Sequence, residues 1–102
     1  MKMKMKNFLD ETIEALEFNK KTIRDVEFVT DGKHKCSWED FVKNANFDYD
    51  NGYSSVKINM CLKIVGKNWW FERCEYDGSE WWSFKEYSIA EIEFGEVIIR
   101  KS

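Results

Sequence analysis

The spacing of apolar and polar positions predicts both helices and strands in this chain. Residues 56–65 alternate apolar with polar side chains throughout, and this period of two predicts a strand with one buried and one exposed face. Residues 7–18 and 37–46 repeat apolar side chains every three or four positions, which predicts two amphipathic helices. Asn7 and Ser37 stand at the positions expected of helix N-caps.

Turn signals divide much of the remaining chain into hairpins. Asp31-Gly32, within residues 25–36, is a dipeptide favoured in two-residue turns, and so is Asp77-Gly78. The second dipeptide joins residues 69–76 to residues 79–86, which predicts an aromatic-rich hairpin.

Two further segments complete the expected topology. Residues 89–100 are apolar and β-branched, which predicts more strand, with Gly95 as a turn or bulge. Residues 47–55 are polar and aromatic without a clear period and predict a loop. We therefore expect an α+β fold: a single antiparallel sheet of about six strands with two helices packed on one face.

The predicted core joins the helices to the alternating strand. Glu11, Glu14 and Glu17 of the first helix are expected to face water. The apolar positions expected to be buried together are Leu9, Ile13, Leu16, Phe41, Val42, Val56, Ile58, Met60, Leu62 and Ile64.

A two-residue turn at Asp77-Gly78 fixes the register of the aromatic hairpin. It places Phe71 opposite Phe84, and Arg73 opposite Trp82 in cation–π geometry. Trp69 and Trp82 then share the face that we expect the helices to cover.

The other face of this hairpin carries Trp70, Tyr76 and Trp81 beside Glu72. Three interpretations are open at this point. Both faces are buried, with residues 47–55 covering the tryptophans; the face is a protein-binding surface; or it is a stacking platform for bases or sugars.

Length and composition limit the classes of protein to consider. The 102 residues suit one domain spanning 1–102, and residues 1–6 (MKMKMK) are expected to be disordered or foreign to it. With 43% hydrophobic and 17% aromatic residues the chain is not disordered, and 16 basic against 19 acidic side chains argue against a general nucleic-acid or membrane-surface binder. Neither a membrane-spanning run nor a signal-peptide core is evident, so we expect a cytosolic protein.

Acidic side chains are concentrated in residues 72–96, which hold eight of them against two basic ones. The expected loop adds Asp48 and Asp50. This charge is consistent with solvated edges and turns. It is also consistent with a surface that docks on the basic face of a nucleic-acid-binding partner.

Catalytic motifs are lacking. The sequence has no P-loop, G-x-G-x-x-G or G-x-S-x-G motif, and its one histidine, His34, has no evident partner. His34 with Cys36, Cys61 and Cys74 could supply four metal ligands, although the spacing is unlike that of structural zinc sites. Glu75 and Glu80 face each other in the expected hairpin and could form an acid–base pair, but mild repulsion is the simpler interpretation. We expect no enzyme, no cofactor and no metal.

Three motifs resemble those of a known group of proteins. They are SWEDF at 37–41, DYDNGY at 48–53 and WWFERCEYDGSEWWSF at 69–84. These are similar to a group of small phage and prophage proteins of low-GC Gram-positive bacteria that share an E-Y-D-G-S-E-W-W core, and the resemblance spans roughly residues 25–86. The group has no assigned activity. Short acidic phage proteins without catalytic residues are, however, the class that supplies anti-CRISPR proteins and other inhibitors of host defence.

The resemblance and the surface chemistry together imply a function. We expect a non-enzymatic phage protein that acts in the host cytoplasm, where it binds and inhibits a host defence protein, with a CRISPR–Cas effector as the first candidate. The alternative is a small-ligand or nucleic-acid binding module using exposed tryptophans; direct nucleic-acid binding and a membrane partner are not expected. The expected partner-binding residues are Trp70, Glu72, Glu75, Asp77, Glu80, Trp81, Asp48, Asp50 and Tyr53.

Overall fold

The structure is a computed structural model that describes residues 5–50, 57–86 and 94–100. Its helices are α1 (Phe8–Phe18), the 3-10 helix η1 (Ile23–Asp25) and α2 (Trp38–Ala45). Its strands are β1 (Met5–Asn7), β2 (Val26–Thr30), β3 (Lys35–Cys36), β4 (Asp48–Asp50), β5 (Lys63–Gly66), β6 (Trp69–Tyr76) and β7 (Ser79–Glu86).

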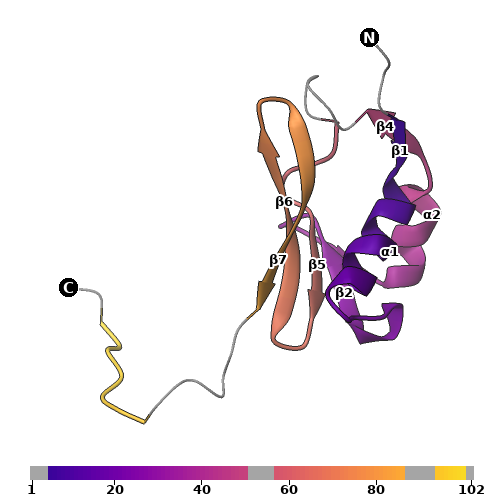
Figure 1. Cartoon of the computed structure of the whole chain (residues 1–102). Helices are drawn as coiled ribbons and strands as arrows, with labels where there is room; N and C mark the ends of the chain where they lie inside the picture. Colours follow the sequence, from indigo (N-terminus) through magenta and orange to yellow (C-terminus); the bar gives the residue numbers. More distant parts are fainter. Residues whose placement is uncertain (1–4, 51–56, 87–93, 101–102) are drawn as a thin grey trace.

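The strands form two antiparallel sheets. Five of them follow the order β3-β2-β5-β6-β7, and β1 pairs with β4 in a separate two-stranded sheet. Both α-helices lie on one side of the larger sheet (Figure 1). The α+β class is therefore confirmed, whereas the expectation of a single sheet of about six strands is wrong.

The short sheet contradicts two expectations: that residues 1–6 lie outside the fold, and that residues 47–55 form a loop. Met5 and Lys6 were expected to lie outside the fold, but they pair with Asp50 and Tyr49. β4 occupies part of the segment predicted as a loop. The pairing continues into α1, where the backbone N–H of Phe8 donates to the carbonyl of Phe47 at 2.8 Å. The start of the first helix is thus tied to the end of the second.

Both predicted helices are confirmed, together with their caps. The side-chain oxygen of Asn7 accepts from the backbone N–H of Asp10 at 2.9 Å. Ser37 accepts in the same way from Asp40 at 3.2 Å. Each bond satisfies a donor that the first helical turn leaves without an intrahelical partner.

The β6–β7 hairpin has the predicted register throughout. Trp69 faces Glu86, Phe71 faces Phe84, and Arg73 faces Trp82. Asp77 and Gly78 both have positive φ, 51° and 86°, as a type I′ turn requires. The other predicted hairpin, β2–β3, is present with a different turn. Thr30 pairs with Lys35, so the connection contains residues 31–34 instead of a two-residue turn.

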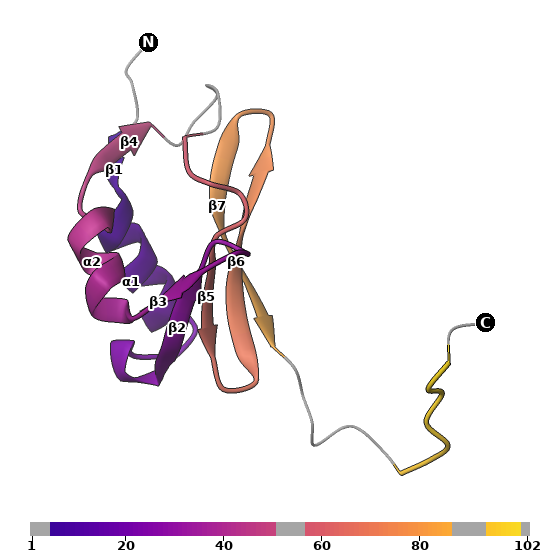
Figure 2. The same ribbon diagram turned by 180° about the vertical axis from the view of Figure 1, so that it is seen from behind.

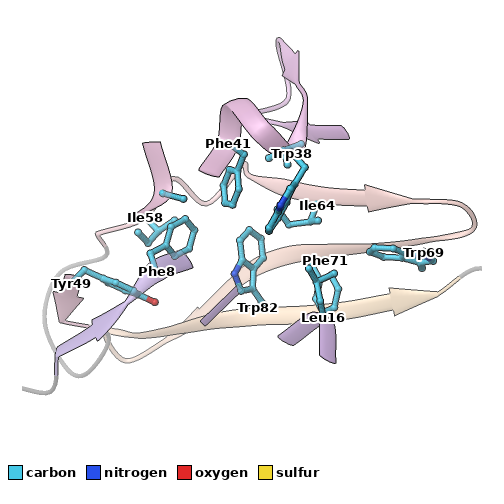
Figure 3. Packing of buried hydrophobic residues seen from close by; sticks show 12 residues of the cluster. Phe8, Leu16, Trp38, Phe41, Tyr49, Ile58, Ile64, Trp69, Phe71 and Trp82 are labelled. Carbon is cyan, nitrogen blue, oxygen red and sulfur yellow. The ribbon is translucent and has the colours of Figure 1, made fainter. Parts of the chain in front are cut away.

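The core lies between the helices and the inner face of the five-stranded sheet (Figure 3). Leu16, Phe41, Ile58 and Ile64 are buried as predicted, together with several aromatic side chains. Gly66 is required for one of these, because a Cβ there would lie 2.1 Å from the indole of Trp69. The buried apolar residues are Phe8, Leu16, Val29, Trp38, Phe41, Ala45, Tyr49, Ile58, Ile64, Trp69, Phe71 and Trp82.

The alternating run 56–65 is mostly not a strand. Only its end enters β5 (Lys63–Gly66), and Val56 lies outside the described residues. Asn59 closes a turn, because its side chain accepts from the N–H of Cys61 and its carbonyl from the N–H of Leu62. Met60 is consequently exposed and Leu62 only half buried, so the predicted five-residue buried face is wrong.

The segment 94–100 is also not a strand. Its described residues have no regular secondary structure and are exposed. Residues 87–93, the beginning of the predicted strand region, lie outside the described residues. The described part of this apolar, β-branched segment therefore does not extend the sheet.

Ile64 and Met60 provide a matched test of this packing. Ile64→Ala should lower the free energy of unfolding by about 2–5 kcal/mol, because the side chain is 1% exposed and its removal leaves a cavity. Met60→Ala should cost less than about 1 kcal/mol, since that side chain is 37% exposed. Equilibrium denaturant unfolding measures both. Equal losses would instead favour a continuous strand over 56–65.

Candidate functional site

The outer face of the five-stranded sheet, opposite the helices, is the candidate functional surface. Among the described elements no helix covers it (Figures 1 and 2). Strand alternation places Phe28, Val65 and Trp70 side by side on this face, across β2, β5 and β6. All three are half buried. They form an apolar row with one side open to solvent.

Polar side chains surround Trp70. Its indole N–H donates to the Glu72 carboxylate at 3.5 Å, and the Lys85 ammonium lies 3.9 Å from the same carboxylate. Lys85 is also the cross-strand neighbour of Trp70. Contacts this long and this exposed contribute little to stability, so the Glu72 carboxylate remains available to a partner.

The aromatic surface continues toward the hairpin turn. Trp81 is 43% exposed and lies opposite Cys74, while Tyr76 is 77% exposed. Tyr76 was placed on this face but was not among the predicted binding residues. Trp70 and Trp81 thus occupy the open face and Trp69 and Trp82 the core, as the turn predicted.

Two of the predicted acidic residues mark the hairpin turn. Glu75 and Asp77 are exposed, and the Glu75 carboxylate accepts from the backbone N–H of Gly78 at 3.1 Å. We call Trp70, Glu72, Glu75, Tyr76, Asp77 and Trp81 the hairpin surface. This surface contains five of the nine predicted binding residues, and Tyr76 in addition.

Glu80 does not belong to this surface, and its assignment as a partner-binding residue is wrong. It is only 2% exposed and points into the interior, where its carboxylate lies 3.0 Å from the Arg73 guanidinium. It also accepts from the backbone N–H groups of Lys57 and Ile58, at 2.7 and 3.1 Å. Glu80 therefore stabilises the fold. It faces Glu75 as predicted, but its charge is already neutralised, which leaves no free carboxylate pair.

The remaining predicted residues lie elsewhere. Asp48 and Asp50 are on β4, in the smaller sheet, which follows α2. The Asp48 carboxylate accepts from the Asn7 side chain at 3.3 Å, and Asp50 is half buried. Tyr53 lies outside the described residues. The two aspartates are thus on different elements from the hairpin surface.

A buried ionic network is the feature that the sequence analysis missed. The Arg73 side chain is fully buried and lies between two carboxylates, Glu11 at 2.8 Å and Glu80 at 3.0 Å. The Tyr49 hydroxyl donates to Glu11 and accepts from Arg73 at 3.0 Å. Glu11 was expected to face water, and that expectation is wrong.

Aromatic rings enclose the guanidinium. Its central carbon lies 4.9 Å from the ring centroid of Trp82 and 5.3 Å from that of Phe8. The Trp82 indole N–H donates to Thr12, whose hydroxyl donates to the Phe8 carbonyl. The predicted contact between Arg73 and Trp82 is confirmed, and its role is internal.

The network changes the acidity of its members. Burial raises the pKa of the Tyr49 hydroxyl well above its usual range, and the neighbouring Glu11 raises it further. Burial alone would lower the pKa of Arg73, but its bonds to Glu11 and Tyr49 outweigh that effect and raise it. Arg73 is therefore charged, and Tyr49 neutral, at physiological pH.

One sequence signal could have revealed the network. The register predicted from Asp77-Gly78 already placed Arg73 and Glu80 on the core face, beside Phe71 and Phe84. A buried arginine needs carboxylate partners, so an acidic side chain on a packed helix was to be expected. Only the structure identifies that side chain as Glu11.

Neither metal nor thiol chemistry is prominent in the described part of the chain. Among the described residues, no group of three or more His, Cys, Asp or Glu is placed to hold a metal ion. Cys36 lines an open groove of about 280 Å³ between α2 and the β2–β3 hairpin. Burial, followed by the nearby Asp40 and Asp31, raises the pKa of its thiol, which disfavours the reactive thiolate.

Comparisons with known proteins give no match. No family model, curated protein or solved structure matches the chain. Among the described residues, no helix has the length and apolar character needed to cross a bilayer.

Glu80→Ala tests whether the inner carboxylate is structural. It should cost about 3–5 kcal/mol in the free energy of unfolding, because it removes a partner of the buried Arg73 and leaves two backbone N–H groups without their acceptor. Its cross-strand neighbour provides the control: Glu75→Ala should cost less than about 1 kcal/mol, since Glu75 is exposed. Chemical denaturation of both variants decides the point, and a small loss for Glu80→Ala would contradict the network.

The Tyr49 hydroxyl predicts a specific response to alkaline pH. Tyr49→Phe should lower the free energy of unfolding by about 1–3 kcal/mol at pH 7, through loss of the hydrogen bonds to Glu11 and Arg73. Above pH 10, the ordinary tyrosine pKa, the unfolded hydroxyl ionises while the folded one stays protonated. The wild type therefore loses stability relative to the variant as pH rises from 10. Urea unfolding between pH 7 and 11 should show the difference shrinking; a constant difference would contradict the raised pKa.

Proposed function

We propose that this is a non-enzymatic phage protein that binds and inhibits a host defence protein through the hairpin surface. The observation that supports binding is the uncovered outer face, which exposed Trp81 and Tyr76 share with half-buried Trp70. Tryptophan and tyrosine are enriched at protein interfaces, where their large rings contribute much of the affinity. The Glu72 carboxylate lies beside the Trp70 indole, and the carboxylates of Glu75 and Asp77 are exposed at the hairpin turn.

The charge of the surface favours a basic partner. Carboxylates that neighbour exposed aromatic rings would steer association with a positively charged face, such as the nucleic-acid-binding face of a CRISPR–Cas effector. This choice of partner rests on the resemblance of the 37–84 motifs to small phage proteins, and the host cytoplasm follows from it. Glu80, being buried, contributes none of this charge.

Plasmid interference in a CRISPR-proficient host tests the proposed function. Expression of the wild-type chain should protect a targeted plasmid, while the double variant Trp70→Ala/Trp81→Ala should not. Loss of each central aromatic anchor is expected to cost about 2 kcal/mol or more of binding to the purified effector, mostly through faster dissociation. The double variant of the remote, exposed pair Lys43→Ala/Asn44→Ala is the matched control and should protect fully.

The charge component has its own variant. Glu75→Lys/Asp77→Lys should slow association with the effector and flatten its dependence on salt, because both side chains are exposed at the hairpin turn. The melting temperature should change little. Stopped-flow association at several salt concentrations measures the effect, and unchanged kinetics would contradict electrostatic docking.

The alternative, a ligand or nucleic-acid module, predicts a different result. Oligonucleotides or sugars would then quench Trp70 and Trp81 fluorescence, and no purified effector would bind. Protection that persists in the double tryptophan variant would overturn the hairpin surface as the binding site. Absence of protection by the wild type against several CRISPR types would overturn the assignment of the target.

A further inference from the structure

The segment 94–100, which we call the exposed segment, has an unusual number of uncovered apolar side chains. Its sequence is FGEVIIR, and its described residues adopt no helix or strand. Phe94 is 109% exposed, Val97 77%, Ile98 88% and Ile99 89%. Large apolar side chains gathered on so short a stretch favour burial against another surface.

The edge of β7 is a surface that an added strand could occupy. β7 is the last strand of the order β3-β2-β5-β6-β7, so its outer edge pairs with no other strand of the described chain. An edge strand presents backbone N–H and C=O groups that a further strand can bind. The strand is eight residues long, which is enough to pair with the whole of the exposed segment.

A groove runs beside this edge on its helix side. It has a volume of about 310 Å³ between β7 and the first helix. Its lining combines apolar side chains with charged ones: Ala15, Phe18, Trp81 and Trp82 with Lys6, Glu11, Glu14 and Glu80. Phe18, at 88% exposed, is an apolar side chain that the fold leaves uncovered. Among the described residues, a backbone edge without a neighbouring strand and an open, partly apolar groove therefore lie side by side.

The two sides of the exposed segment differ, and this difference gives a strand on the β7 edge a preferred orientation. In a strand, Gly95, Val97 and Ile99 would point to one side, whereas Phe94, Glu96, Ile98 and Arg100 would point to the other. A strand laid along β7 with its wholly apolar side toward α1 would place Val97 and Ile99 over the groove. Its mixed side would then continue the outer face, where Phe94 and Ile98 would add to exposed Trp81, and Glu96 would carry a charge opposite to that of Lys85.

We propose that the exposed segment of one copy pairs with the β7 edge of a second copy, and that the exchange is reciprocal. The segment stands clear of the β7 edge of its own chain (Figure 1). Each copy supplies one segment and one β7 edge. Reciprocal exchange therefore produces a closed, two-fold symmetric dimer in which both β7 edges are paired. The exchange would cover Phe18 of each copy and the Val97 and Ile99 side chains of its partner at the same time.

The test compares two variants of the full chain. Light scattering after size exclusion should give twice the 12.3 kDa chain mass for the wild type. Val97→Lys/Ile99→Lys should raise the dimer dissociation constant roughly a hundredfold or more and yield the monomer, because it removes the two β-branched apolar side chains that would be buried over the groove. Glu96→Lys changes charge on the opposite side of the segment and should remain dimeric. The melting temperature of the monomeric variant, measured at low concentration, serves as the folding control.

Hydrogen exchange locates the contact. In the wild-type dimer the outward-facing amides of β7 should be protected, and the Val97→Lys/Ile99→Lys variant should lose that protection at least roughly tenfold. A monomeric wild type overturns the proposal. Protected β7 amides in that monomer would indicate that the segment pairs with β7 of its own chain. Unprotected β7 amides would indicate that the segment binds a foreign partner instead. A dimer that survives the double lysine variant, or one whose β7 amides exchange freely, overturns it as well.

Discussion

The Arg73 guanidinium carries its charge where water does not reach it, and much of the structure serves to stabilise that buried charge. Removing such a charge from water costs several kcal/mol unless carboxylates and further hydrogen bonds surround it. Two of its partners come from distant parts of the chain, Glu11 from α1 and Tyr49 from β4, and the third, Glu80 on β7, belongs to the same hairpin. Glu80 in turn holds the backbone at Lys57 and Ile58. One side chain thus links the two sheets, a helix and an irregular segment.

The inner and outer faces of the β6–β7 hairpin consequently differ in what they can do. On the inner face every ionised group of the network has a partner within the chain, and the rings of Phe8 and Trp82 fill the space around the guanidinium. On the outer face Trp70 and Trp81 have no covering helix among the described elements. Recognition of a partner therefore falls to the outer face, while the inner face holds the domain together.

The sequence was most informative where local rules decide the structure. Positive φ at Asp77 and Gly78 fixes a two-residue turn, and that turn alone determines which partner each residue from Trp69 to Glu86 faces. The caps at Asn7 and Ser37 are equally local. From these local signals both α-helices could be predicted, and so could the side of the aromatic hairpin on which each residue lies.

The sequence failed where a distant partner decides the structure. Glu80 resembles a surface acid at a turn until Arg73 and two backbone N–H groups are seen to bind it. The alternation over 56–65 was overridden because Asn59 closes a turn and Ile58 is bound to Glu80. Similarly, pairing of β1 with β4 joins two segments without a strong strand pattern, which left a second sheet unforeseen. For the candidate site, periodicity identified the outer tryptophans, but it could not separate exposed Glu75 from buried Glu80.

The network also has a consequence for the order of folding. The β6–β7 hairpin is local, since its turn brings together residues close in sequence. One partner of Arg73, Glu80, is supplied by the hairpin itself, but Glu11 lies 62 positions away, and the Trp82 bond to Thr12 spans 70. A hairpin without α1 would therefore leave its arginine with an incomplete set of partners. Closing so long a loop costs more entropy than closing a two-residue turn, so the hairpin pairing does not require α1, whereas the full burial of Arg73 does.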